Sequence, residues 1–259
     1  MKQPKLKYYQ LGDNVTAFSS TRHGGVSNGN YGEFNINAFC GDLEQNISQN
    51  RNALCTELGI ENDHLVMPHQ THGIESRDIA EEFFTLPTEV RKMLLEDVDC
   101  VMTDVKNICI GVSTADCIPV LLYDPVHHTA CAVHAGWRGT LNRITHKEVL
   151  EMNRVYGTSP SDVKAVVGPG ISLENFEVGQ EVYDEFEKVG FEMNKIARMY
   201  DKWHIDLPLC NKFQLEQAGV KVENIQMSDI CTFSQVNDYF SARRLGTDSG
   251  RIYTGIVLR

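Results

Sequence analysis

The stretch Thr114–Thr140 reads TADCIPVLLYDPVHHTACAVHAGWRGT, and two apolar runs in it set the expectation for the fold. The first run continues backward to cover Asn107–Tyr123 and is rich in Ile, Val, Leu and Cys; the second covers Thr129–His134. Short apolar runs bounded by turn residues are typical of buried strands. Asp124 and Pro125 supply the turn between the two runs. The stretch therefore predicts two buried strands, joined by a tight turn.

Three side chains near these runs can bind a metal ion. Cys117 and His134 lie within the stretch, and His72 precedes them in HQTHG, residues 69–73. One thiolate and two imidazoles suffice to hold a catalytic zinc ion whose fourth position stays open to water or substrate. The same groups could instead be a nucleophilic cysteine with its base, or a buried thiol and hydrogen-bonded histidines. The spacings match no zinc-finger pattern, so the residues alone leave these alternatives open.

The surroundings of Cys117 distinguish it from the other cysteines in apolar runs. Asp116 precedes it and Pro119 follows two positions later, which interrupts the strand pattern and indicates a strand end. Folds of the α/β class place their chemistry at strand ends. Cys117 is therefore a stronger functional candidate than Cys100, Cys109 or Cys131.

Composition narrows the class of protein. The chain has 259 residues, of which 42% are hydrophobic and 23% charged, as in an ordinary globular protein with a sizeable core. The net charge of −11 argues against a nucleic-acid polymer as partner, although local arginines can still bind a small anion. No run has the length of a membrane span, and the N-terminus has no signal-peptide core. The eight scattered cysteines form no CxxC pair, which favours reduced thiols and a cytoplasmic protein.

The remaining pattern interleaves strands and helices. Neither an internal repeat nor a linker is present, so residues 1–259 are expected to form one domain, a layered α/β sandwich with a mixed sheet. The order along the chain predicts the following strands and helices: strand Val15–Ser20, helix Asn46–Leu58 closing at Gly59, helix Thr140–Tyr156 ended by Gly157, strand Lys164–Val167, helix Phe176–Val189, a helix near Leu209–Ala218 and two C-terminal strands.

Polar residues outside the thiol and imidazole groups suggest where an anion could bind. Arg22 opens the loop TRHGGVSNGNYG, whose glycines permit close backbone approach to a ligand. Arg243 and Arg244 lie in FSARRLG, and guanidinium groups suit phosphate. Asn35 could orient a ligand by hydrogen bonds or stabilise a turn. The sequence contains no GxxxxGK[ST], GxGxxG or HExxH pattern, which excludes the obvious nucleoside-triphosphate, dinucleotide and metalloprotease sites.

Taken together, these motifs resemble the YfiH/laccase-domain family, once called multicopper polyphenol oxidoreductases and now described as purine nucleoside phosphorylases with adenosine deaminase activity. The resemblance covers nearly the whole chain. Its blocks, in order, are SSTRHGGVS (19–27), FNINAFCGD (34–42), NR (50–51), QTHG (70–73), TADCIPVLL (114–122), AVHAGWRGT (132–140), VGPGIS…FEVGQEV (167–182), CT (231–232), FSARR (240–244) and GR (250–251).

The resemblance implies a YfiH-like fold and a zinc site formed by His72, Cys117 and His134, with copper as the less favoured metal. It implies purine nucleosides and phosphate as substrates, phosphorolysis of the nucleoside, and deamination of adenosine by zinc-activated water. For phosphate the expected residues are Arg22 first and Arg243 second. Asn35 is expected to bond the nucleoside.

Departures from the family pattern are few. Ala242 stands where a tyrosine is usual, Cys100 replaces a small residue after Asp99, and His69 is an additional imidazole. None removes an implied metal ligand. The rival functions are a cysteine hydrolase or amidase acting on peptidoglycan precursors, with Cys117 as nucleophile and His134 as base, and a copper-dependent phenol oxidase. A monomer or small homo-oligomer is expected.

Overall fold

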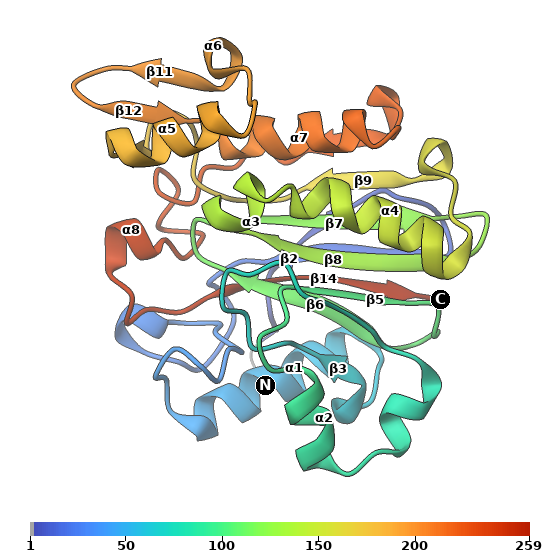
Figure 1. The fold of residues 1–259 in the computed structure, drawn as a ribbon. Helices are drawn as coiled ribbons and strands as arrows, with labels where there is room; N and C mark the ends of the chain where they lie inside the picture. The colour runs from blue at the N-terminus through green and yellow to red at the C-terminus, as the bar shows by residue number, and fades with distance from the viewer. Residues whose placement is uncertain (1–2) are drawn as a thin grey trace.

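The computed structural model describes residues 3–259 and arranges its strands in three sheets (Figure 1). A six-stranded sheet has the order β13-β9-β7-β8-β5-β4, and a five-stranded sheet the order β1-β2-β14-β6-β3. Both contain parallel and antiparallel pairs. The third sheet, β10-β12-β11, is antiparallel throughout. The predicted α/β fold is confirmed, with two mixed sheets and one antiparallel sheet in place of a single mixed sheet.

The strands are short, and along the sequence they both precede and follow the longer helices. Their bounds are β1 Leu6–Tyr9, β2 Val15–Ser20, β3 Leu65–Val66, β4 Ser76–Asp78, β5 Cys100–Thr103, β6 Cys109–Thr114, β7 Ile118–Asp124, β8 Thr129–Ala135, β9 Lys164–Val167, β10 Glu177–Val178, β11 Ala197–Met199, β12 Trp203–Ile205, β13 Ile225–Met227 and β14 Ile252–Leu258. The α-helices are α1 Glu44–Leu58, α2 Thr88–Leu94, α3 Trp137–Leu141, α4 Ile144–Tyr156, α5 Gln180–Lys188, α6 Met193–Ile196, α7 Leu207–Gln217 and α8 Ala242–Leu245.

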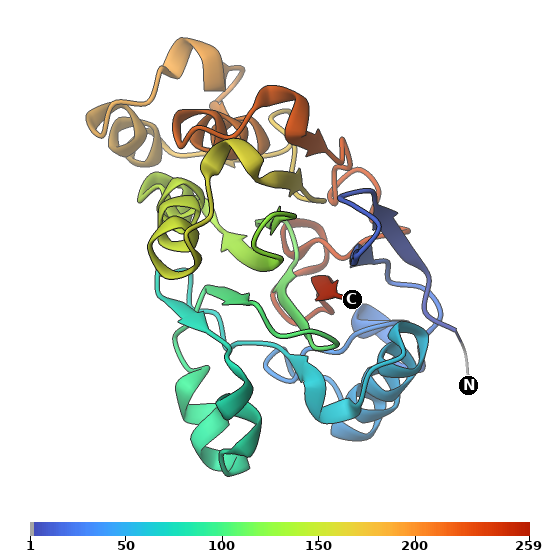
Figure 2. The ribbon, with the colours of Figure 1, turned by 90° about the vertical axis from the view of Figure 1, so that its right-hand side faces the viewer.

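Alternation of side chains along the strands produces a layered core. On β7, Val120 and Leu122 pack with the helices, whereas Leu121 and Tyr123 pack toward the five-stranded sheet. Successive side chains of a strand point to opposite faces, so one apolar strand supplies two cores. A third cluster lies between the five-stranded sheet and α1. The resulting layers run from α1 through two sheets to α4 and α7, and the end-on view in Figure 2 shows this arrangement.

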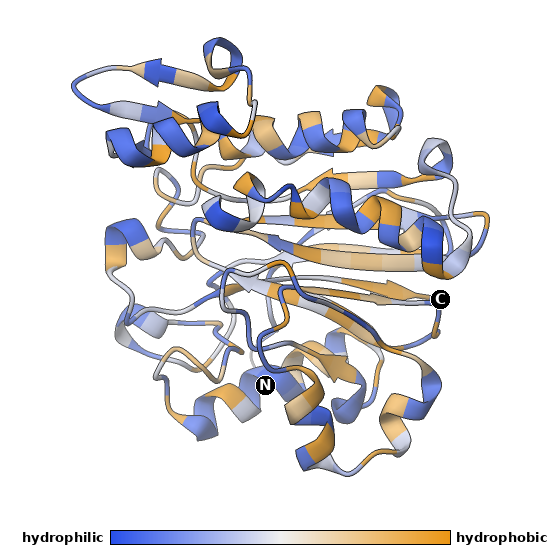
Figure 3. Cartoon of the chain, in the orientation of Figure 1, coloured by the Kyte–Doolittle hydropathy of each residue, from blue (hydrophilic) through white to orange (hydrophobic). Residues whose placement is uncertain are grey.

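Hydropathy follows these layers. Strands β7 and β8 are mostly apolar along their length, whereas α4 and α5 alternate between polar and apolar residues (Figure 3). A helix that covers a sheet needs only one apolar face. Among residues 3–259, none of the helices is both long enough and apolar enough to cross a bilayer.

Most predicted elements are confirmed, including β2, β9 and the left-handed closure of α1 at Gly59, where φ is 63°. The predicted single strand Asn107–Tyr123 is wrong. It divides into β6 and β7, which belong to different sheets, and the chain crosses between them through residues 115–117. Any part of a uniformly apolar run can be buried in either sheet. Local hydropathy therefore does not show where the chain crosses from one sheet to the other.

Two predicted helices also differ from the structure. The helix predicted over 140–156 is two helices, α3 and α4, because Arg143 has a left-handed backbone with φ of 58°. The helix predicted over 176–189 begins only at Gln180, because Glu177 and Val178 pair with β12. The helix expected near 209–218 is α7, and Asp206 caps its N-terminus by accepting a hydrogen bond from the backbone of Leu209.

Candidate metal centre

The structure brings His72, Cys117 and His134 together. One ligand atom from each lies within 4.8 Å of the others, and the two imidazole rings have centroids 4.9 Å apart at 72°. His134 is buried, Cys117 half-buried and His72 exposed, so the group lies at the surface end of a buried strand. A thiolate sulfur and two imidazole nitrogens that converge in this way can bind a transition metal. Because one side of the group is exposed, a coordination position would stay open.

Each of the three comes from a different kind of segment. His134 is near the end of β8, and Cys117 ends the crossing between β6 and β7, where Asp116 adopts a left-handed φ of 89°. His72 also has a left-handed backbone, with φ of 66°, in the loop after β3. The carboxylate of Asp116 holds the crossing in place by accepting hydrogen bonds from the hydroxyl of Thr232 and the backbone N–H of Arg243.

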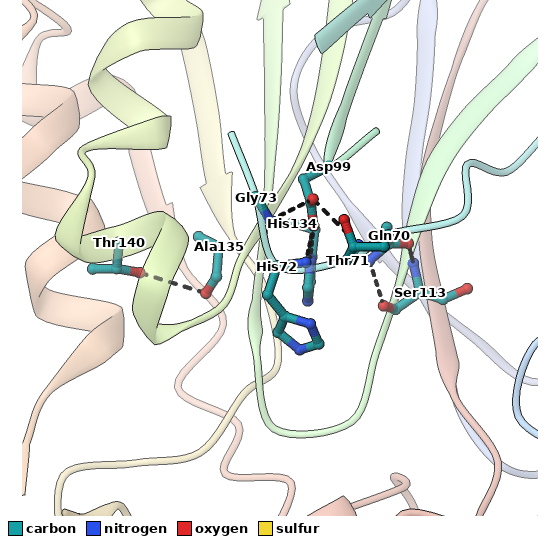
Figure 4. A network of polar contacts seen from close by, with 9 residues as sticks. All are labelled: Gln70, Thr71, His72, Gly73, Asp99, Ser113, His134, Ala135 and Thr140. Atoms are coloured by element: carbon teal, nitrogen blue, oxygen red, sulfur yellow. Dashed lines mark hydrogen bonds and ion pairs between the residues drawn. The ribbon is translucent and has the colours of Figure 1, made fainter. Parts of the chain in front are cut away.

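Asp99 connects two of the ligands. Its buried carboxylate accepts a hydrogen bond of 2.6 Å from Nδ1 of His134, and others from the backbone N–H groups of Thr71, His72 and Gly73 (Figure 4). With Nδ1 bonded to Asp99, Nε2 is the ring nitrogen of His134 that remains for a metal. A carboxylate behind a histidine is the usual partner of metal-binding imidazoles.

Two further residues shape the site. The side-chain amide of Gln70 bonds both the carbonyl and the N–H of Ser113, which ties the His72 loop to the end of β6 (Figure 4). Gly136 follows β8, and a Cβ there would lie 2.9 Å from Cδ2 of His72 and 3.2 Å from Sγ of Cys117. Only glycine leaves these ligands in their observed positions.

The electrostatics favour an ionised thiol. Burial opposes ionisation, but the adjacent His134 and His72 lower the pKa of Cys117 to about 6. Burial likewise disfavours a charged His134, but the thiolate and Asp99 raise its pKa to about 9. The hydrogen bonds and charge of His134 keep the pKa of Asp99 low despite its burial. Between these values the metal-free site holds a thiolate beside an imidazolium.

The three residues predicted to bind substrate lie in different surroundings. Arg22 is half-buried, donates from Nε to the carbonyl of Gly32 and from Nη1 to that of Val236, and stacks on the Phe240 ring at 4.8 Å. Arg243 is exposed and donates to the carbonyl of Glu177.

Asn35 is completely buried. Its amide donates to Asp42, and its carbonyl accepts from the backbone of Arg251. Its contact with a nucleoside stays a prediction.

Sequence reasoning did not find Asp99, Gln70 or Gly136. Asp99 carried a usable signal, since it is an acidic residue placed directly before the apolar strand β5, where a carboxylate needs a partner. Gln70 and Gly136 act through contacts that only the folded chain creates.

Comparison with known proteins agrees with this fold. Residues 16–259 match the family described as multi-copper polyphenol oxidoreductase laccase. A purine nucleoside phosphorylase of Bacteroides thetaiotaomicron is 40% identical over 248 residues, covering 95% of this chain and 92% of the relative. Adenosine deaminase RL5, from an unknown prokaryotic organism, is 40% identical over 256 residues and 97% of each chain.

Solved structures share the architecture. YlmD from Geobacillus stearothermophilus has a TM-score of 0.89 at 26% identity, covering 97% of this chain and 94% of that one. A Bacillus licheniformis protein described as hypothetical protein YfiH has a TM-score of 0.88 at 28% identity, covering 95% and 93%. The mixed α/β fold with a converging Cys/His group thus defines a class of metal-associated proteins. Within it, this chain belongs to the laccase-like YfiH family.

Proposed function

We propose that this protein is a zinc-dependent purine nucleoside enzyme that cleaves adenosine, inosine or guanosine with phosphate and also deaminates adenosine; methylthioadenosine is a further candidate substrate. The observation that carries the proposal is the convergence of His72, Cys117 and His134 around one point, backed by Asp99. The names of two relatives at 40% identity, a purine nucleoside phosphorylase and an adenosine deaminase, support the choice of substrate.

The donor set fits zinc on three grounds. A thiolate and two imidazoles match the ligand preference of zinc, and Cys117 ionises near pH 6, well below an ordinary thiol. Asp99 fixes the tautomer of His134 that leaves Nε2 free. Gly136 leaves the space beside the donors free of a side chain. When bound, zinc would act as a Lewis acid toward water or a substrate oxygen.

The protein's own groups then have separate tasks. His134, with Asp99 behind it, holds or moves a proton at Nε2 when the metal is absent and orients the metal when it is present. His72 and Cys117 determine how far below the protein surface a metal would lie. Asp99 holds the backbone conformation of His72, and Asp116 holds that of Cys117.

We propose that Arg22 neutralises phosphate. Its Nε and Nη1 already bridge the carbonyls of Gly32 and Val236, which leaves Nη2 to meet an anion. The segment 231–243 connects Arg22 to the metal centre, because Asp238 accepts from the backbone of Arg22 while Arg243 donates its backbone N–H to Asp116. Arg243 is the second candidate for phosphate. Asn35 would hydrogen-bond the nucleoside; in the structure its side-chain amide donates to Asp42.

The first experiment measures products and metal in the same preparation. Protein purified without added metal is assayed for zinc and copper, then incubated with inosine or adenosine with and without phosphate. We expect zinc and not copper in the protein, release of the base from inosine only with phosphate, and ammonia from adenosine without it. Base release that is independent of phosphate, or neither product from zinc-loaded protein, would refute the proposal.

A cysteine hydrolase is the second candidate, because the metal-free centre pairs a thiolate of Cys117 with the imidazolium of His134. Chelator-treated protein separates the two functions. Loss of nucleoside activity that returns with zinc supports the first candidate; full hydrolytic activity without metal, with a covalent adduct on Cys117, supports the second. Several coppers per chain would indicate the phenol oxidase instead.

We further propose that residues 1–259 act as one catalytic unit in the cytoplasm, as a monomer or small homo-oligomer. The family match to residues 16–259 and the eight free thiols support this arrangement. Its partners would be the nucleoside and phosphate, with neither a nucleic-acid polymer nor a membrane involved.

A further inference from the structure

A second group of metal-binding side chains lies in the interior, between the six-stranded sheet and α4. Cys100 on β5 and Cys131 on β8 come from paired strands, and Glu148 comes from α4, which packs on β8. One ligand atom from each lies within 4.8 Å of the others, and all three residues have no exposed surface. The group shares no residue with the centre formed by His72, Cys117 and His134.

The carboxylate of Glu148 is the unexplained part of this group. Both of its oxygens are buried, and neither has a hydrogen-bond partner among residues 3–259. The ammonium of Lys147 lies 3.7 Å from Oε1, but it also donates to the carbonyl of Ile74 at 2.5 Å. Burial raises the pKa of Glu148 above its ordinary value, although interactions with the Cys100 thiol, the Lys147 ammonium and the Ser76 hydroxyl oppose the rise. A buried carboxyl group is normally protonated, hydrogen-bonded, paired or bound to a metal, because desolvation of an unpartnered carboxylate is too costly.

We propose that Cys100, Cys131 and Glu148 bind a thiophilic divalent cation such as zinc, at a site separate from the catalytic centre. The donors match those of zinc, which takes both thiolates and carboxylates. The two sulfurs are 3.2 Å apart, and two thiolates on tetrahedral zinc would be roughly 3.8 Å apart given Zn–S bonds of about 2.3 Å. A small rotation of either side chain therefore completes the geometry.

Charge and register agree with a metal. Burial raises the pKa of Cys100, of Cys131 and of Glu148, so a divalent cation would bind with release of their protons. The two thiolates and the carboxylate would then carry three negative charges, and the cation would leave one, which Lys147 offsets. Cys100 pairs with Val133 and Cys131 pairs with Met102, so the cysteines are diagonal neighbours on one face. Diagonal positions lie about 7–8 Å apart, farther than the backbone of an unstrained disulfide allows. A bridging ion suits this separation better than a covalent bond.

A surface cavity of about 500 Å³ lies along the same seam of β5 and α4, and none of the three proposed ligand residues lines it. Met102, two residues past Cys100, and Glu151, one helical turn past Glu148, both line it, together with Ser76. The ion would tie β8, which carries His134, to α4 and β5.

The test uses Cys117→Ser, which disables the catalytic centre and leaves the second group intact. We expect this variant to keep about one zinc per chain after dialysis against zinc-buffered solution. With cobalt in place of zinc, it should show thiolate-to-cobalt charge-transfer absorption, and zinc should raise its thermal unfolding midpoint. Cys117→Ser/Cys131→Ala should lose the bound metal, the absorption and the shift in midpoint.

Cys117→Ser/Cys210→Ala is the matched control, because Cys210 is an equally buried thiol in the same apolar cluster and outside the group. It should behave as Cys117→Ser does. Cys117→Ser/Glu148→Gln keeps the size of the side chain and serves if the alanine variant does not fold; it should also lose the metal.

Absence of thiolate–cobalt absorption in folded Cys117→Ser would overturn the proposal, as would its persistence after Cys131→Ala. The proposed nucleoside activity is tested on the other centre, so either idea can fail without the other.

Discussion

Replacing Asp99 with asparagine tests how the candidate metal centre is held together. The carboxylate accepts hydrogen bonds of 2.6 Å from Nδ1 of His134, 2.7 Å from the N–H of Gly73 and 3.0 Å from that of His72. Asparagine has the same shape but is neutral, and one of its two terminal groups can only donate. It therefore weakens every one of these bonds and places a donor against a donor in at least one.

The size of the effect follows from the bonds. A hydrogen bond to a charged group contributes about 1.5–3 kcal/mol and one between neutral groups about 0.5–1.5 kcal/mol, so each bond weakens by roughly 1 kcal/mol. The three shortest of its four bonds together give a loss of about 3 kcal/mol in the free energy of unfolding of the metal-free protein; the fourth, from the N–H of Thr71, is longer at 3.3 Å. Loss of the carboxylate behind a histidine ligand should also weaken zinc binding by about 10- to 100-fold.

Asp124→Asn is the matched control. Asp124 is also completely buried, and it also accepts hydrogen bonds from a histidine Nδ1 and two backbone N–H groups, those of His127 and Val126. It is the last residue of β7, next to the turn that leads to β8. Urea unfolding and zinc competition against a chromophoric chelator measure the two effects. Both variants should lose stability, and only Asp99→Asn should lose zinc affinity. An Asp99→Asn protein that binds zinc as tightly as the wild type would refute the assigned role.

Three further predictions address the same centre. Gly136→Ala should weaken zinc binding by about tenfold or more, because its Cβ would press on His72 and Cys117; unchanged affinity in chelator competition would contradict this packing argument. In metal-free protein, the rate at which iodoacetamide alkylates Cys117 should rise with pH through a midpoint near pH 6, because His134 stabilises the thiolate. Asp99→Asn removes support for the imidazolium and should move this midpoint to higher pH. A wild-type midpoint near that of a free thiol would show that the pair of thiolate and imidazolium does not form. Arg22→Ala should reduce phosphate-dependent cleavage of inosine by about 1.5–3 kcal/mol in activation free energy, more than it reduces deamination of adenosine; equal losses would assign Arg22 to holding the loops of Gly32 and Val236.

Local sequence determined much of the secondary structure. The apolar run of β8 and the glycine that closes α1 act through neighbouring residues, so their pattern is visible along the chain. The same reasoning identified Cys117, His72 and His134 as candidate ligands from their chemistry. The resemblance to the YfiH family then chose the zinc interpretation from the alternatives that the residues left open.

The tertiary structure decided what distant segments do to each other. The apolar run 107–123 divides between two sheets according to which strands pair with each part of it. The hydropathy of the run does not indicate that pairing. Asp99 bonds both the His72 loop and His134 because β5 pairs with β8, although 35 positions separate it from that histidine. The same pairing, with α4 packed against it, brings Cys100, Cys131 and Glu148 together. Such contacts arise from strand register and helix packing, which join residues irrespective of their separation in sequence.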